Sequence, residues 1–409
     1  EKGVEILLRD ARGRIKGNYQ DGKFDRQPVP GKNLTLSLDL ELQQLGERLM
    51  QHKLGSIVAI EPSTGEILCL VSSPTYDPRL MVGRQRGKNH QMLNADPHLP
   101  LLNRAINGTY PPGSTFKTSQ ALTFLEEGII TPQTAFSCTG GFRLGRLKVG
   151  CHGSHTLSLL PAIGTSCNGY FCWGLYYMLG NRKKYKNVQE AMTTWKDYMV
   201  SMGFGYQLGV DLPGEKRGMI PNADYYDKHL GHSWSGPSVI SIAIGQGEVT
   251  LTPLQIANLG ATIANRGYYI TPHIVKEVQG EPLDTTYSTK HYTKVSRRNY
   301  EYVVEGMRRA VTGGTCRTAN NPWYEVCGKT GTAQNRGHDH SVFMGFALKE
   351  NPQIAVAVYV ENGGWGATFG VPIGALIMEK YINGHLSAAS ETRAESIEKK
   401  VIFYGSSKR

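Results

Sequence analysis

The chain has 409 residues, 40% of them hydrophobic, which is enough to bury a core in one large domain or two ordinary ones and excludes a disordered chain as the default. The 45 lysine and arginine residues exceed the 34 aspartate and glutamate residues, and the net charge of +11 favours anionic partners. No zinc-finger spacing, aromatic RNA-binding strand or glycine-rich phosphate loop accompanies this charge, so we predict no nucleic-acid partner.

The first residues, EKGVEILLRDARGR, have neither the apolar region nor the cleavage site of a signal peptide. No apolar run approaches the ~20 residues that a membrane span needs. Because the chain starts without methionine and in mid-pattern, we expect an excised piece whose targeting segment was cut away.

Residues 1–33 are rich in glycine, lysine and arginine and predict an extended arm. In NLTLSLDLELQQLGERLMQHK, the alternation of a strand changes at Asp39 to the period of a helix, which Asp39 would cap. GSIVAIEPSTGEILCLVSSP predicts a hairpin, since two β-rich runs flank the turn PSTG.

A helix is expected after Ser114, in PPGSTFKTSQALTFLEEG. Residues 131–165 should be rich in loops, with a small hairpin in TGGFRLGRLKVG. Apolar helices are expected at 171–179 and 188–202, and TPLQIANLGATIAN predicts a helix with proline in its first turn.

Strands are predicted at 325–334, 341–348 and 353–362, followed by a helix at 373–382 and a charged tail. Two early strands, a helical middle and three late strands indicate an α+β fold, in which helices are segregated around an antiparallel sheet.

Ser114 and Lys117 lie one helical turn apart, so they would share a face, and a lysine held off water could act as a base toward the hydroxyl. Ser396 and Lys399 repeat the spacing in the charged tail. Only Ser114 follows Pro-Pro-Gly and opens a buriable helix, whose N-terminus favours developing negative charge. A helix cap and a solvated lysine are the alternative interpretation.

Two more motifs favour the catalytic interpretation: Ser166-Cys167-Asn168, and KTGT at Lys329–Thr332. S-x-x-K, S-x-N and K-T-G in this order resemble the signature of penicillin-binding proteins and class A β-lactamases. The blocks LTLSLDLELQ, SIVAIEPSTGEILCLVSSPTYDP, NRAINGTYPPGSTFK, GQGEVTLTPLQIA and CGKTGTAQ resemble class B penicillin-binding proteins over most of the chain. The opening EKGVEILLRDARGRIKG is similar to the end of the membrane-proximal pedestal in the elongation-type, penicillin-binding protein 2 group.

This resemblance implies a transpeptidase fold like that of serine β-lactamases: a five-stranded antiparallel sheet, flanking helices and a helical subdomain. Residues 1–50 would be the end of the pedestal and a linker, 51–385 the transpeptidase domain, and 386–409 a charged tail. The protein would lie at the periplasmic face of the bacterial inner membrane, anchored by an N-terminal helix absent from this chain.

In this chemistry Ser114 is the nucleophile, and Lys117 is its base if burial and Lys329 lower its pKa. Ser166 would relay a proton to the leaving amine, and Asn168 would orient Lys117 and the substrate amide. Whether Lys117 or the pair of Ser166 and Lys329 takes the first proton stays open.

The KTGT strand would bind the donor. Lys329 adds positive charge, Thr330 and Thr332 offer hydroxyls to a terminal carboxylate, and Gly331 allows close approach of the substrate. The resemblance implies an oxyanion hole from the N–H groups of Ser114 and Thr332, with the donor peptide bound by strand addition.

We therefore expect a peptidoglycan D,D-transpeptidase of cell-wall elongation that acts on stem peptides of lipid-linked nascent glycan, is acylated by β-lactams and works with a membrane glycosyltransferase. In a D,D-carboxypeptidase or β-lactamase, water would resolve the acyl-enzyme instead. A β-lactam sensor is the alternative without catalysis.

The predicted reaction requires no cofactor. Cys138, Cys151, His152 and His155 nevertheless have donor types and spacing that suit a structural zinc ion. A Cys138–Cys151 disulfide and two unlinked thiols are the alternatives. Cys167 is expected to fill a small space in the packing rather than to act as a nucleophile, and Cys316 and Cys327 are expected to fill small core positions.

Overall fold

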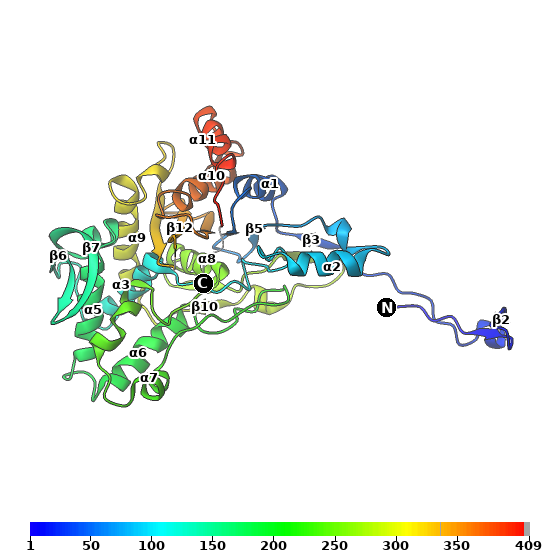
Figure 1. Ribbon diagram of the computed structural model, residues 1–409, viewed down its shortest axis with the longest axis horizontal. Coiled ribbons are helices and arrows are strands. Elements are labelled where there is room, and N and C mark those ends of the chain that lie inside the picture. Colours follow the sequence, from blue (N-terminus) through cyan, green and yellow to red (C-terminus); the bar gives the residue numbers. More distant parts are fainter. Residues whose placement is uncertain (336, 405–409) are drawn as a thin grey trace. The chain divides into compact units, whose positions relative to one another are not determined.

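The computed structural model describes residues 1–335 and 337–404 (Figure 1). The chain forms two compact units, of which the smaller holds residues 1–36 and 275–283. The larger unit holds residues 37–274 and the described chain from Asp284 onward. These limits differ from the segments 1–50, 51–385 and 386–409, which stay predictions about functional parts.

The smaller unit consists of short strands and one turn, as expected for an extended arm. Strand β1 pairs with β2, and β3 pairs with β9, both antiparallel. Its elements are β1 (Leu7–Arg9), β2 (Ile15–Asn18), the 3₁₀ turn η1 (Tyr19–Gly22), β3 (Leu34–Leu36) and β9 (Val275–Val278).

The larger unit is built on one five-stranded sheet in which all neighbouring strands are antiparallel. In spatial order the strands are β11 (Val326–Ala333), β12 (His340–Ala347), β13 (Ile354–Val360), β4 (Gly55–Ile60) and β5 (Ile67–Ser73). The early hairpin and the three late strands were therefore predicted correctly, and so was the α+β fold. Strand β11, which carries KTGT, lies at one edge of the sheet.

Helices cover both faces of this sheet. In β13, Ala355, Ala357 and Tyr359 belong to the core shared with α8 (Pro253–Ala264), while Val356 and Val358 belong to the core on the opposite face. Figure 1 shows this second face covered by α1 (Leu40–Leu49), α10 (Gly370–Asn383) and α11 (Ala388–Glu398). The alternation of strand side chains thus fixes two separate cores.

Helix α3 (Lys117–Glu126), whose residues from Lys117 to Leu125 are all buried, packs against α4 (Leu159–Gly164), α5 (Asn168–Gly180), α6 (Val188–Ser201) and α9 (Arg297–Thr312). The larger unit also contains α2 (Arg86–Ala95) and α7 (Ala223–Leu230). The 3₁₀ segments are η2 (Pro78–Met81), η3 (Gly113–Phe116), η4 (Gly236–Ile244), η5 (Thr285–Tyr287) and η6 (Arg317–Ala319). The additional strands are β6 (Phe136–Leu144), β7 (Leu147–Leu157), β8 (Tyr268–Ile270) and β10 (Lys290–Tyr292).

Several elements differ from the expectations. The hairpin β6–β7 extends over most of the stretch expected to be loops. Helix α9 was not predicted, and the charged tail contains α11, which Ser387 caps. Within the described ranges, no helix has the length and apolar character needed to cross a membrane.

The cap of α1 provides a stability test. The Asp39 carboxylate accepts a hydrogen bond from the Leu42 N–H, at 2.9 Å. Asp39→Ala should lower the free energy of unfolding by about 1 kcal/mol, because one N–H at the helix start loses its partner. Denaturant unfolding measures this loss, and Asp39→Asn, which keeps an acceptor oxygen, is the control. Equal losses in the two variants would contradict the capping role.

Candidate active site

Ser114 lies in a tight turn held by backbone contacts. The 3₁₀ turn η3 places residues three apart one above the other, so Ser114 and Lys117 lie on the same side of the chain. Gly113 has φ of +56°, in the left-handed region, and its N–H donates to the Gly245 carbonyl at 3.0 Å. The turn therefore needs glycine at position 113.

The same turn packs against the KTGT strand without intervening side chains. A Cβ atom on Gly113 would lie 2.8 Å from the Thr332 carbonyl oxygen, and one on Gly331 would lie 3.0 Å from the Pro112 oxygen. Because both contacts involve backbone atoms, neither position has room for a side chain. The backbone that carries Ser114 thus lies directly beside the edge strand β11.

Lys117 is fully buried, and its ammonium group is surrounded by acceptors. It donates to the Ser166 carbonyl at 2.7 Å, to the Ser166 hydroxyl at 3.2 Å and to Asn168 Oδ1 at 2.5 Å. Burial lowers the pKa of Lys117 to about 8, and the neighbouring cysteine thiols oppose this in smaller measure. In residues 1–335 and 337–404, no hydrogen bond joins Lys117 to the Ser114 hydroxyl.

Lys329 approaches the same serine from β11. Its ammonium donates to the Ser166 hydroxyl at 2.8 Å and to the Thr330 carbonyl at 3.0 Å. Burial, and then the charge of Lys117, hold the pKa of Lys329 well below its usual range. Ser166 itself has φ of +59°, an uncommon value for a residue other than glycine. Its hydroxyl therefore lies within hydrogen-bonding distance of both lysines.

The two threonines of KTGT have different environments. The Thr330 hydroxyl is hydrogen-bonded to that of Thr315 at 2.8 Å, so it is already engaged within the protein. The Thr332 hydroxyl accepts a long hydrogen bond of 3.4 Å from the Gly366 N–H, and its carbonyl accepts one of 3.4 Å from Gln246. Thr332 is partly exposed, so its hydroxyl is the more accessible of the two.

Three neighbours of this site were not singled out from the sequence: Thr315, Gln246 and Gly366. Gln246 lies in the block GQGEVTLTPLQIA, which carried part of the family resemblance without a role for any residue. Thr315 follows Gly313 and Gly314, and Gly366 follows Trp365, and no pattern in the chain marks either residue. Their proximity to KTGT depends on how α9 and the segment after β13 return to the sheet.

A cluster of three thiols, from Cys138, Cys151 and Cys167, lies beside Asn168. Their sulfur atoms all lie within 4.8 Å of one another, and those of Cys151 and Cys167 are 3.9 Å apart. The Asn168 N–H donates to the Cys151 sulfur at 3.2 Å, and its side-chain amide donates to the Gly150 carbonyl at 2.7 Å. Strand β7 is thereby joined to the S-x-N motif.

The membership of this cluster differs from the predicted zinc ligands. Cys167 joins it instead of only filling space, whereas the His152 ring packs edge-on against Trp365, with ring centroids 4.8 Å apart. His155 lies opposite Cys138 in the β6–β7 ladder and is outside the cluster. All seven cysteines, each within the described residues, are free thiols, so the Cys138–Cys151 disulfide is not formed.

The chain matches known proteins over most of its length. The family model "Penicillin binding protein transpeptidase domain" matches residues 55–379. The peptidoglycan D,D-transpeptidase MrdA of Acinetobacter baumannii is 36% identical over 393 residues, which cover 90% of this chain and 56% of that protein. The crystal structure of Pseudomonas aeruginosa PBP2 in complex with WCK 5153 has a TM-score of 0.78 and 34% identity, with 88% of this chain and 79% of that chain covered.

A penicillin G acyl-enzyme complex of penicillin-binding protein A from M. tuberculosis has a TM-score of 0.70 and 28% identity, with 87% and 82% of the two chains covered. The chain spans 56, 63 and 60% of the MrdA proteins of Acinetobacter baumannii, Haemophilus influenzae and Escherichia coli. The resemblance to class B proteins of the penicillin-binding protein 2 group is confirmed by these matches. The chain belongs to the penicillin-binding protein transpeptidase family.

Proposed function

We propose that this protein is a peptidoglycan D,D-transpeptidase that forms peptide cross-links through an acyl-enzyme on Ser114. The observation that carries the proposal is the convergence of three motifs on one hydroxyl. Lys117 of S-x-x-K and Lys329 of K-T-G both donate to Ser166 of S-x-N, at 3.2 and 2.8 Å. The membership of the chain in the transpeptidase family supports the same reaction.

In the acylation step, the Ser114 oxygen attacks the carbonyl of the penultimate D-alanine. Its proton passes to Lys117, whose lowered pKa makes the neutral amine accessible. The peptide C–N bond breaks, and the Ser166 hydroxyl, which contacts both lysines, relays a proton to the departing D-alanine amine. Asn168, which accepts from Lys117, orients that ammonium.

Strand β11 binds and polarises the donor. The N–H groups of Ser114 and Thr332 form the oxyanion hole, because the Gly113 and Thr332 backbones lie against each other. The accessible Thr332 hydroxyl binds the terminal carboxylate, and the buried Lys329 adds positive charge beneath it. The Thr330 hydroxyl is bound to Thr315. The edge position of β11 and the absence of a side chain at Gly331 suit a donor peptide that pairs as an added strand.

An amine from a neighbouring stem peptide then attacks the carbonyl of the acyl-enzyme. The new amide bond forms, the ester bond to the Ser114 oxygen breaks, and the proton that the amine loses restores the Ser114 hydroxyl. β-Lactams acylate Ser114 because they present a strained amide in the same place. D,D-carboxypeptidase and β-lactamase activities are the alternatives, since both differ only in using water at this step. A sensor without cross-linking activity is the third candidate.

The substrate determines the partners and the location that we propose. Stem peptides are attached to nascent glycan, so a membrane glycosyltransferase must supply the strands that this enzyme cross-links. Peptidoglycan lies outside the cytoplasm, which places the reaction at the periplasmic face of the inner membrane. The net charge of +11 suits carboxylated stem peptides and lipid-linked phosphates.

We also propose that Cys138, Cys151 and Cys167 hold a structural zinc ion. Zn–S bonds of about 2.3 Å give sulfur separations of about 3.8 Å in a tetrahedral site. The sulfur atoms of Cys151 and Cys167 are 3.9 Å apart, which is close to this value. All three sulfur atoms lie within 4.8 Å of one another, so only a small movement of the side chains would bring them to the separations of a zinc site. The ion would join the hairpin β6–β7 to the S-x-N motif.

The function is tested by intact-mass analysis after treatment with benzylpenicillin, followed by peptide mapping. We expect one covalent adduct, on Ser114, and none on Ser114→Ala with an unchanged melting temperature. An adduct on another residue would remove Ser114 from its role. Incubation with donor and acceptor peptides should yield a new amide, whereas steady-state hydrolysis of the β-lactam would favour the hydrolase alternatives.

The pH dependence of acylation tests the base. Burial penalises the charged ammonium, so the neutral amine of Lys117 forms at a lower pH than that of an exposed lysine. The second-order acylation rate should rise about tenfold per pH unit and level off above a pKa of about 8. Lys117→Arg, which keeps its charge, should be slow at every pH. A rate that levels off only near pH ~10 would contradict a lowered pKa.

Metal analysis tests the cysteine cluster. The purified protein should contain about one zinc ion per chain, and Cys138→Ala or Cys151→Ala should remove most of it. Cys69→Ala is the matched control, because Cys69 is also buried but lies in the core of the other sheet face. Equal zinc contents in all four proteins would contradict the proposed site.

A further inference from the structure

The segment that precedes Ser114 has few backbone groups that can fix its position. Tyr110 exchanges backbone hydrogen bonds with Leu251, at 2.9 and 2.8 Å, and Gly113 donates to Gly245. Pro111 and Pro112, between these two anchors, have no N–H group. Side chains must therefore fix the loop there, and the Tyr359 hydroxyl donates to the Pro111 carbonyl at 3.2 Å.

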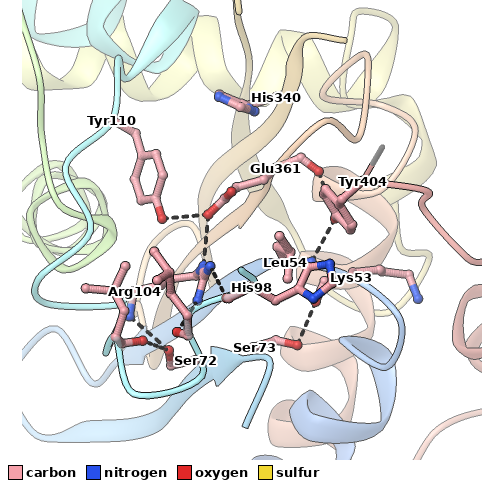
Figure 2. A network of polar contacts seen from close by, with 12 residues as sticks. Lys53, Leu54, Ser72, Ser73, His98, Arg104, Tyr110, His340, Glu361 and Tyr404 are labelled. Carbon is pink, nitrogen blue, oxygen red and sulfur yellow. Dashed lines mark hydrogen bonds and ion pairs between the residues drawn. The ribbon is translucent and has the colours of Figure 1, made fainter. Parts of the chain in front are cut away.

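Tyr110, next to the two prolines, makes further side-chain contacts. Its ring stacks on that of Tyr359, with centroids 4.4 Å apart and an angle of 25° between the planes. Its hydroxyl donates to the Glu361 Oε1 atom at 2.8 Å (Figure 2). Burial, and then the charge of Glu361, raise the pKa of Tyr110, so the phenol keeps its proton and remains a donor.

The Glu361 carboxylate is held by a buried arginine. Arg104 is 3% exposed, and its Nε donates at 2.9 Å to the same Oε1 atom that accepts from Tyr110. The two terminal nitrogens of the same guanidinium group donate to the His98 and Leu99 carbonyls, at 2.7 and 3.1 Å. Arg104 thus compensates the carboxylate charge while its own position is fixed by a turn of backbone.

The backbone of Glu361 is fixed from the opposite side. Its N–H donates to the Leu54 carbonyl at 2.8 Å, which continues the pairing of β13 with β4. Its carbonyl accepts from the Tyr404 hydroxyl at 3.0 Å, and this hydroxyl accepts from the Leu54 N–H at 2.7 Å. Figure 2 shows Tyr110 and Arg104 at the carboxylate and Tyr404 at the backbone of Glu361.

We propose that Glu361 is a positioning residue for Ser114, acting through Tyr110, and that Tyr404 near the C-terminus holds Glu361 in place. This proposal rests on the proposed function, because its effect is on acylation of Ser114. The contact of Glu361, which follows β13, with Tyr110 sets the position of Pro111 and Pro112. These prolines in turn set the position of the Ser114 N–H and hydroxyl beside Thr332. Neither Glu361 nor Tyr404 lies in any of the three catalytic motifs.

Stopped-flow acylation by a fluorescent penicillin tests the proposal, because it separates the dissociation constant of the first complex from the rate constant of the chemical step. Tyr110→Phe, which keeps the ring stack, should lower the chemical rate constant about tenfold and change the dissociation constant less than about twofold. Glu361→Gln and Tyr404→Phe should each lower the rate constant about threefold, since each keeps part of the network.

A second tyrosine–glutamate–cation cluster provides the matched control. Tyr198 donates to Glu127 Oε1 at 2.7 Å, and Lys184 pairs with Glu127 at 2.6 Å, at the far end of α3. Tyr198→Phe removes the same kind of hydrogen bond and should leave the rate constant unchanged. Near-ultraviolet circular dichroism and the melting temperature show that each variant is folded during the assay.

The outcomes separate a positioning role from a structural one. A purely structural role would lower the melting temperature and leave the acylation rate constant of the folded variants within about 1.5-fold of the original, which would overturn the proposal. If Tyr110→Phe does not fold, Glu361→Gln and Tyr404→Phe decide by the same criterion. Failure of the proposed function is distinct from both results, because the unaltered protein would then form no adduct, or would be acylated without forming a new amide from donor and acceptor peptides.

Discussion

Lys117 and Lys329 are both fully buried, and both donate to the hydroxyl of Ser166. Burial disfavours the charge of both ammonium groups, and the charge of Lys117 adds to this effect at Lys329, so each pKa falls toward the range in which an amine can accept a proton. The free-energy cost of burying two ammonium groups is offset by hydrogen bonds to acceptors, above all Asn168 Oδ1 and the carbonyls of Ser166 and Thr330. Much of the surrounding structure serves to exclude water from these contacts.

Helix α3 shows how far this exclusion extends. It is buried all around, although it contains several polar side chains, and each of these finds a partner inside the protein. Thr118 and Ser119 donate to carbonyls one turn back, and Gln120 both donates to Ile242 and accepts from Trp195. A buried helix with satisfied polar groups is rigid, and it therefore fixes the direction of the Lys117 side chain.

Local signals in the sequence predicted the elements that depend on local chemistry. Asp39 caps α1, and α8 begins with a proline in its first turn, as the sequence predicts. The thiol cluster could not be predicted in the same way, because Cys167 reaches Cys151 only through the fold of α4. Neighbouring residues of a strand face opposite sides, so His152 cannot bind the same ion as Cys151. This exclusion requires knowing that one strand, β7, contains both residues. The roles of the motif residues stay predictions, whereas their proximity is observed.

The site exists only when the whole larger unit is folded, because its parts come from distant segments. Lys117 meets Ser166 across 49 positions, and Lys329 meets Ser166 across 163 positions. Lys117, Ser166 and Lys329 come from three separate segments, so they meet only when these segments pack against one another. Glycines at 113, 245 and 331 allow three backbones to meet closely, and side chains there would separate the segments. The chemistry thus depends on backbone packing as directly as on the reactive groups.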